Sequence, residues 1–348
     1  MLLSRIDNLK NNIRGDEMIR RYAVALVALI SLVVFTISPI YAATNNNQGS
    51  GLRVSPVRTD LTINPGKTQT TYVSIRNLTT TKVILQVFIN DFSASGNSGN
   101  PALNINNTNT YNPHSLKQFV SPINDVTVNP GQTQSIPVVI KIPANNPGGG
   151  YYGAVRFAPA TNTPDSKKTV ELTASIASLI LVRVPGPGIK ENLNLTGFGV
   201  ESNNQTSRLF YTNSGLEVVS TFTNQGNVQE EPFGKVSVTN DITGKVVQYL
   251  NINDVTPPGN VLPDSSRTFS LKLNKLGSIG KYTIMGNYGY GNNGQLLSAK
   301  TTIYVITPIW IVALLSIVIL IIAIIWFTPK LFRAWYRRSI RKLNSSKG

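Results

Sequence analysis

Apolar and polar residues alternate through most of the middle of the chain, in short runs separated by turns rich in Asn, Gly and Pro. Thr71 to Ile75 and Ile84 to Ile89 are two clear examples. Alternation with a period of two is typical of a strand that packs one face inward and exposes the other to water. The pattern therefore predicts antiparallel sheets packed as sandwiches, and little helix outside the two ends of the chain.

A first longer apolar run lies near the N-terminus. Arg20 and Arg21 precede the run from Tyr22 to Ile37, and small residues follow at Ala42 and Ala43. This order of a basic, an apolar and a small-residue region predicts a signal peptide that is cleaved between Ala42 and Ala43. Met18 is an alternative start of translation, and an uncleaved anchor helix is the alternative structure.

A second apolar run, Ile309 to Phe327, predicts one transmembrane helix because 19 residues can cross a hydrocarbon core. Trp310 and Trp326 stand at its two ends, where aromatic rings favour the membrane interface. Lys330 and Arg333 begin a tail with seven basic residues and no acidic one. The positive-inside rule predicts that this tail is cytoplasmic and that residues 43–308 lie outside the cell. A buried core helix is the disfavoured alternative.

One turn motif recurs before strands. The first copy is Asn64-Pro65-Gly66 and the second is Asn129-Pro130-Gly131. Leu262-Pro263-Asp264 is a looser third copy. Pro followed by Gly suits the two central positions of a type II turn. The copies predict similar hairpins, two in one domain and one in the next.

These patterns predict an all-β protein with two immunoglobulin-like antiparallel sandwiches in tandem. The expected segments, in chain order, are a signal peptide 1–42, a flexible leader 43–51, a first sandwich 52–184, a hinge 185–188 with the sequence Pro-Gly-Pro-Gly, a second sandwich 189–306, a transmembrane helix 307–328 and a basic tail 329–348.

Charge and cysteine content narrow the classes of function. The chain carries a formal net charge of +16, but residues 43–308 hold 20 basic and 13 acidic groups, spread thinly. Much of the excess positive charge lies near the two ends of the chain, beside the apolar segments, where basic residues set membrane topology. Nucleic acid is therefore not expected as a partner. The chain has no cysteine, which excludes disulfides and thiolate metal sites.

The first predicted sandwich resembles the N-terminal domain of WxL-interacting surface proteins. The resemblance rests on Leu61 to Asn77, Phe88 to Asp91, Val128 to Pro143 and Gly148 to Phe157, and it covers about residues 52–158. The order of signal peptide, two immunoglobulin-like domains, C-terminal helix and basic tail is similar too. The resemblance implies a prokaryotic surface-anchored binding module, associated with peptidoglycan and with partner surface proteins.

Residues that could carry chemistry are scarce. His114 is the only histidine, and we interpret it as a loop residue. No loop of clustered acids suggests a metal site, and no phosphate-binding Gly-rich loop precedes a helix. We therefore expect neither catalysis nor a cofactor.

The long polar segment from Asn90 to Gln118 predicts either a recognition loop or a disordered decoration. Tyr111 within it, and Tyr151 and Tyr152 after three glycines, are candidate contacts for a glycan or a protein. The favoured alternative is that Tyr152 lies in the core and Tyr151 is partly exposed.

The sequence thus favours a membrane-anchored binding or scaffold protein that recognises cell-wall polymer or a partner surface protein. Two alternatives stay open. One is a membrane-tethered assembly chaperone that acts by β-strand addition at an exposed edge such as Ile176 to Val184. The other is an exported hydrolase.

Overall fold

The computed structural model describes residues 51–105, 112–160 and 175–345. The expected signal peptide with Ala42 and Ala43, most of the expected leader, and Tyr111 lie outside the described residues.

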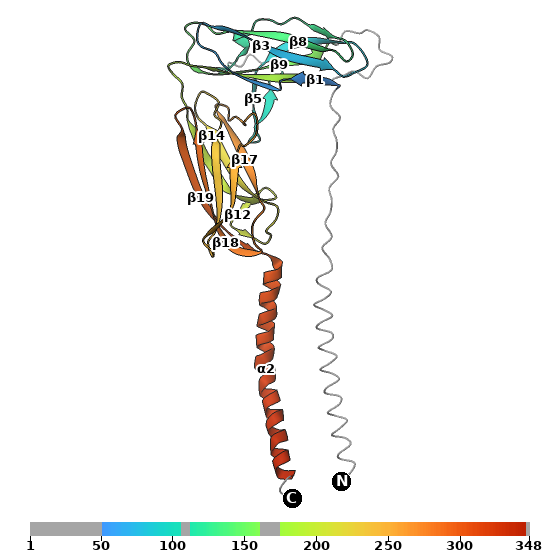
Figure 1. Cartoon of the computed structure of the whole chain (residues 1–348), viewed down its shortest axis with the longest axis vertical. Helices are drawn as coiled ribbons and strands as arrows, with labels where there is room; N and C mark the ends of the chain where they lie inside the picture. The colour runs from blue at the N-terminus through green and yellow to red at the C-terminus, as the bar shows by residue number, and fades with distance from the viewer. Residues whose placement is uncertain (1–50, 106–111, 161–174, 346–348) are drawn as a thin grey trace. The chain divides into compact units, whose positions relative to one another are not determined.

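The first sandwich consists of a three-stranded and a five-stranded sheet with orders β1-β3-β8 and β2-β10-β9-β4-β7, and a separate hairpin β5-β6 (Figure 1). Its elements are β1 (Leu52–Ser55), β2 (Arg58–Thr62), β3 (Thr68–Asn77), β4 (Val83–Asn90), β5 (Phe92–Ser95), β6 (Asn100–Leu103), the 3-10 helix η1 (Lys117–Phe119), β7 (Val126–Val128), β8 (Thr133–Lys141), β9 (Gly149–Pro159) and β10 (Ile176–Val184).

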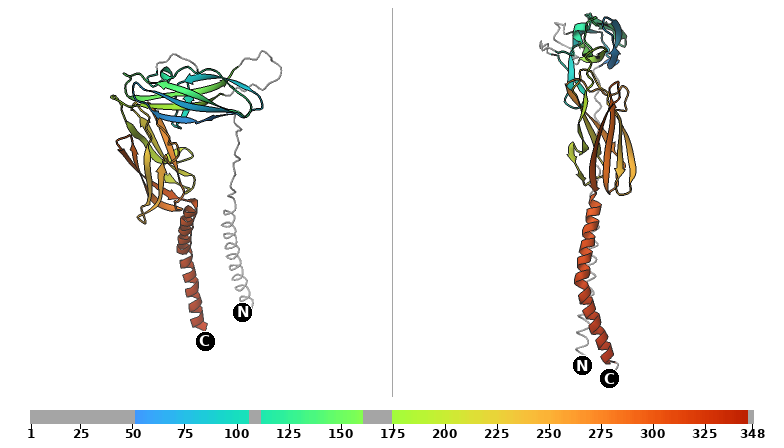
Figure 2. Two further views of the ribbon diagram at one scale, coloured as in Figure 1. Left: turned by 45° about the horizontal axis from the view of Figure 1, so that its top comes forward. Right: turned by 90° about the vertical axis from the view of Figure 1, so that its left-hand side faces the viewer.

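The second sandwich has a four-stranded sheet β12-β11-β14-β17 and a five-stranded sheet β13-β19-β18-β15-β16 (Figure 2). Its strands are β11 (Leu193–Ser202), β12 (Gln205–Ser207), β13 (Leu209–Phe210), β14 (Leu216–Asn224), β15 (Phe233–Asn240), β16 (Lys245–Ile252), β17 (Ser265–Leu273), β18 (Ile279–Tyr290) and β19 (Gln295–Ile306).

The two sandwiches share one strand order. The row β1-β3-β8 corresponds to β11-β14-β17, and β2-β10-β9-β4-β7 corresponds to β13-β19-β18-β15-β16. In each five-stranded sheet the last strand pairs antiparallel with its neighbour and parallel with a short early strand, β2 or β13. The predicted fold class, two immunoglobulin-like sandwiches in tandem with one C-terminal helix, is confirmed. The pairing departs from fully antiparallel at this parallel edge of each five-stranded sheet.

The three predicted turns are present. Lys67 N–H donates to Asn64 O at 3.1 Å, and Gln132 N–H donates to Asn129 O at 3.1 Å. Gly66 and Gly131 have φ of +76° and +72°, as the third residue of a type II turn requires. In the looser copy Asp264 occupies that position with φ of +54°.

Each sandwich has its own apolar core between its sheets. Val73, Ile75, Val138 and Phe157 are among the fully buried residues of the first core. In the second, the rings of Phe222 and Tyr288 meet edge to face at 5.1 Å. Tyr288 also shares a 2.7 Å hydrogen bond with Ser220, so its hydroxyl is satisfied inside the core.

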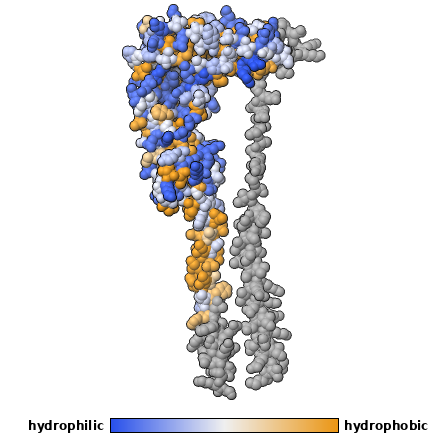
Figure 3. Space-filling model, in the orientation of Figure 1, coloured by the Kyte–Doolittle hydropathy of each residue, from blue (hydrophilic) through white to orange (hydrophobic). Residues whose placement is uncertain are grey.

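The last element is the helix α2 (Pro308–Ser345), which follows β19 after one residue. Its segment Pro308–Pro329 is long and apolar enough to cross a membrane, with a mean hydropathy of 3.2 and none of that window buried against the protein. Figure 3 shows its apolar surface in orange. The side chains of Lys330 and Arg333 lie outside the described residues.

Candidate binding cleft at the junction of the sandwiches

Residues 50–348 form one compact unit, in which the two sandwiches are joined by hydrogen bonds at the start of β9. Gly148 N–H donates to Pro187 O at 3.2 Å, and Gly150 N–H donates to Asn227 O at 2.8 Å. A Cβ on Gly148 would lie 2.6 Å from Gly186 O, so only glycine permits this approach of the backbones. Two of the three glycines before the tyrosine pair, Gly148 and Gly150, therefore contribute to the junction. The flexibility of the predicted 185–188 hinge stays a prediction, and motion there would have to break these contacts.

A small apolar cluster extends the junction. Phe92, Tyr152, Ala154 and Leu181 of the first sandwich are buried together, and Leu262 of the second packs against them. The Tyr152 hydroxyl donates to Gln229 Oε1 at 3.0 Å. Burial raises the pKa of Tyr152 well above its usual range.

The sequence predicted a loop from Asn90 to Gln118. The structure differs in part, because β5 and β6 form a hairpin within this segment. Gly96 and Gly99, both with positive φ, make the tip of that hairpin. Thr268 N–H on β17 donates to Asn97 O in the tip at 2.8 Å. The hairpin therefore contacts the second sandwich.

Arg58 on β2 links the two sandwiches by charge. Its guanidinium donates to Asp60 Oδ2 at 2.7 Å, to Glu231 Oε1 at 3.1 Å and to Pro258 O at 2.6 Å. Two carboxylates therefore neutralise a half-buried cation. Asp60 in turn accepts a long 3.5 Å contact from Asn260 Nδ2.

A cleft of about 370 Å³ lies on one side of this network and has an acidic lining. Arg183 on β10 forms an ion pair with Glu191 there. Glu230 is only 2% exposed, and its Oε1 has no hydrogen-bond partner. Burial, and secondarily the charge of Glu191, raise the pKa of Glu230 to about 7.

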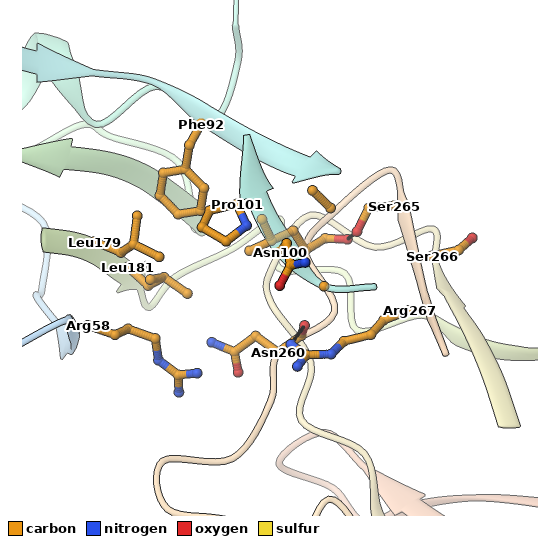
Figure 4. Close-up of a pocket in the computed structure, with 13 residues that line it drawn as sticks. Arg58, Phe92, Asn100, Pro101, Leu179, Leu181, Asn260, Ser265, Ser266 and Arg267 are labelled. Carbon is orange, nitrogen blue, oxygen red and sulfur yellow. Dashed lines mark hydrogen bonds between the residues drawn. The ribbon is translucent and has the colours of Figure 1, made fainter. Parts of the chain in front are cut away.

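A smaller cavity of about 60 Å³ lies on the other side, between β2, β10, the β5-β6 hairpin and β17 (Figure 4). In this view the Asn260 amide lies between the guanidinium groups of Arg58 and Arg267, and the side chains of Phe92, Leu179 and Leu181 face them. Arg267 donates from Nη1 to Asn260 O at 3.0 Å. We refer to these two cavities, one lined by Arg58 and Arg267 and the other by acidic residues, as the two sides of the binding cleft.

Two of the three tyrosines predicted from the sequence lie within the described residues, and both are buried. Tyr151 and Tyr152 are 6% and 3% exposed. Tyr151 packs edge to face on Phe119 at 5.1 Å and donates to Pro147 O at 3.2 Å. The structure therefore favours a packing role for both rings, and their contact with a ligand stays a prediction.

Three other predicted positions can be placed. His114 lies in a turn, as predicted, and its Nδ1–H donates to Gly150 O at 2.8 Å. Trp310 is 45% exposed at the start of α2, where its Nε1–H donates to Ser278 Oγ, and Trp326 is 63% exposed near the end of the apolar segment. The edge proposed for strand addition is wrong, because β10 pairs with β9 along its length and with β2 at Leu179 to Arg183.

The sequence did not predict the residues of the cleft. Arg58, Arg183, Glu230 and Arg267 are far apart along the chain, so no local sequence pattern joins them. The pair Glu230-Glu231 precedes Pro232, and this local sequence is typical of a turn. Among the described residues, no group of three or more His, Cys, Asp or Glu side chains could hold a metal ion.

Residues 58–159 match the family model described as WxL Interacting Protein, peptidoglycan binding domain. The resemblance predicted for about residues 52–158 is thus confirmed, and the first sandwich carries this domain. Arg58 and the β5-β6 hairpin lie within the match, whereas Arg267 and Glu230 lie beyond it.

Solved structures similar to the chain are fimbrial chaperones at low identity. The class 5 fimbriae chaperone CfaA is 12% identical, with a TM-score of 0.34, over 72% of this chain and 98% of the other. The E. coli chaperone DraB is 12% identical, with a TM-score of 0.29, over 73% and 96%. No curated protein sequence matches the chain.

Proposed function

We propose that this protein is a single-pass surface protein that binds peptidoglycan through its first sandwich and holds a partner surface protein at the cell wall. The single observation that carries the proposal is the family match over residues 58–159. We propose further that the protein is a binder without catalytic activity, since the cleft joins its charged groups in ion pairs across two domains rather than presenting a nucleophile beside a base.

The anchoring half of the proposal rests on α2. Its apolar segment is long enough to span a bilayer, and the seven basic residues after it would hold the C-terminus in the cytoplasm. Only Thr307 separates β19 from α2, so the second sandwich would stand close to the membrane and the first would lie within reach of the wall.

Cosedimentation of the purified full-length chain, held in detergent micelles, with insoluble peptidoglycan tests the first half. We expect saturable retention in the pellet, and no more retention on chitin than without polymer. Equal retention on chitin and peptidoglycan, or none on either, would contradict peptidoglycan recognition.

Protease treatment of intact cells tests the anchoring half. External protease should release fragments of residues 43–308 and leave the basic tail protected. If the tail is digested while the sandwiches survive, the proposed orientation is wrong.

A further inference from the structure

Arg267 is a half-buried cation that lacks an acidic partner among the described residues. Its side chain lies over the Phe269 ring at 5.1 Å and donates one hydrogen bond to Asn260 O. The backbones of Gly99 and Gly259 enclose the guanidinium, and a methyl group on either glycine would overlap it. The cation is therefore held in one place on the wall of the small cavity.

The charge of Arg267 is destabilised where it stands. Burial and the nearby charge of Arg58 both lower the pKa of Arg267. Arg58 itself is neutralised by Asp60 and Glu231, whereas no salt bridge in the described part of the chain includes Arg267. An arginine has five N–H donors, and it binds carboxylates with paired hydrogen bonds. An anion in the cavity would supply the missing partner.

Asn260, beside the same guanidinium, has a side-chain oxygen that lacks a hydrogen-bond donor. This residue is 7% exposed, and its Oδ1 is buried with no hydrogen-bond partner. A buried acceptor without a donor is energetically unfavourable. A ligand that offers an N–H next to its carboxylate would satisfy both Asn260 and Arg267.

The opposite wall of the cavity is apolar. Phe92, Leu179 and Leu181 face the two polar side chains across the space (Figure 4). The cavity of about 60 Å³ is small, since a single water needs about 10–15 Å³ of such space. That space suits a small terminal group, such as a carboxylate next to a carbon that bears one methyl group.

We propose that this cavity binds the C-terminal acyl-alanine carboxylate of an un-cross-linked peptidoglycan stem peptide, with the carboxylate on Arg267, the last amide N–H on Asn260 Oδ1 and the methyl group against Leu179 and Leu181. The proposal rests on the proposed function and names the part of the polymer that this site recognises. The site would give the second sandwich a part in ligand binding, because Arg267 and Asn260 both belong to that sandwich.

Calorimetric titration of the full-length chain in micelles tests the site. The probes are N,N′-diacetyl-L-lysyl-D-alanyl-D-alanine and the same peptide with a C-terminal amide. We expect the acid to bind at least tenfold more tightly than the amide. Arg267→Gln should remove this difference, and Arg53→Gln, an exposed arginine on β1, should keep it.

A second variant covers the case in which Arg267→Gln fails to fold. Asn260→Asp would place a carboxylate beside Arg267 and occupy the anion position from within, so the protein should stay folded and lose affinity for the acid at least tenfold. Unchanged affinity in this variant would overturn the site.

The results separate this site from the proposed function. Equal binding of acid and amide to the native chain, together with retention on insoluble peptidoglycan, overturns the carboxylate site and leaves the proposed function standing. Loss of retention on peptidoglycan with selective binding of the acid supports the site and overturns the proposed function.

Discussion

Asn77 and Asn224 make the same set of hydrogen bonds in the two sandwiches. Each is fully buried at the end of a central strand, β3 or β14. Asn77 Nδ2 donates to Thr81 O at 2.7 Å and to Val128 O at 3.0 Å. Asn224 Nδ2 donates to Val228 O at 2.7 Å and to Val261 O at 2.8 Å.

The two asparagines position the proline-containing turns. Val128 and Val261 each come two residues before the proline of such a turn, and Gly131 N–H and Asp264 N–H donate back to the backbone oxygens of Asn77 and Asn224. The shared corner explains why the same turn recurs before β8 and β17.

Replacement of either asparagine by alanine should destabilise its sandwich by about 1–3 kcal/mol, because a buried carbonyl oxygen, Val128 O or Val261 O, loses its side-chain donor. Urea unfolding of the full-length chain in micelles measures the change. Asn97→Ala, in the exposed tip of the β5-β6 hairpin, is the control and should stay within about 0.5 kcal/mol of the native value. Equal effects at Asn97 and Asn224 would contradict the structural role of the corner.

Gly148→Ala should weaken the junction of the two sandwiches. The added Cβ would lie 2.6 Å from Gly186 O, and two backbones would have to separate, at a typical cost of about 1–3 kcal/mol. Faster limited proteolysis within 185–188 would report the loss of contact.

Gly149→Ala is a matched control for that experiment, because its Cβ would meet nothing closer than 3.7 Å. If both variants are cleaved at the native rate, the glycine run does not hold the sandwiches together.

Strand positions and turns could be predicted from the sequence because both depend on local patterns. The apolar run from Ile176 to Val184 is β10, and Pro65-Gly66 marks the turn before β3. The partners of a strand are a non-local property, so the sequence suggested a free edge at β10 where the structure has a strand on each side.

The binding cleft could not be predicted for the same reason. Arg58 and Glu231 are 173 residues apart, and only the docking of one sandwich on the other makes them partners. The polar composition of Asn90 to Gln118 suggested a loop, but Phe92 and Leu103 give its hairpin enough apolar surface to join the cluster around Tyr152. The exposure of Tyr151 could not be predicted from the alternation of apolar and polar residues either, because residues on both faces of β9 are buried.

Two charges inside the apolar part of α2 should release the protein from membranes. Leu315→Arg with Ile319→Arg would add about 2.5–3.5 kcal/mol per charge at the middle of a span, so we expect the double variant in the soluble fraction after carbonate extraction. Asn344→Arg in the basic tail is the control and should stay in the membrane fraction. Retention of the double variant would mean that α2 is not the anchor.

Glu230 should make the stability of the junction depend on pH. Its pKa is raised to about 7 in the folded protein from an ordinary value of 4.5, so the folded state binds this proton more tightly than the unfolded state. The contribution is therefore most favourable below about pH 4.5, declines as pH rises through 7, and is constant above that. The free energy of unfolding can fall by at most about 1.4 kcal/mol per pH unit from one such group.

Glu230→Gln keeps the size of the side chain and removes the titration. Asp60, Glu191 and Glu231 are further carboxyl groups near the junction, with Arg58 and Arg183 facing them, so the quantity to compare is the difference in unfolding free energy between native and variant. Urea unfolding at pH 4.5, 6 and 8 should show the variant gaining stability relative to the native chain as pH rises. A difference that stays constant across this range would show that the pKa of Glu230 is the same in the folded and the unfolded protein, which would contradict the effect of burial.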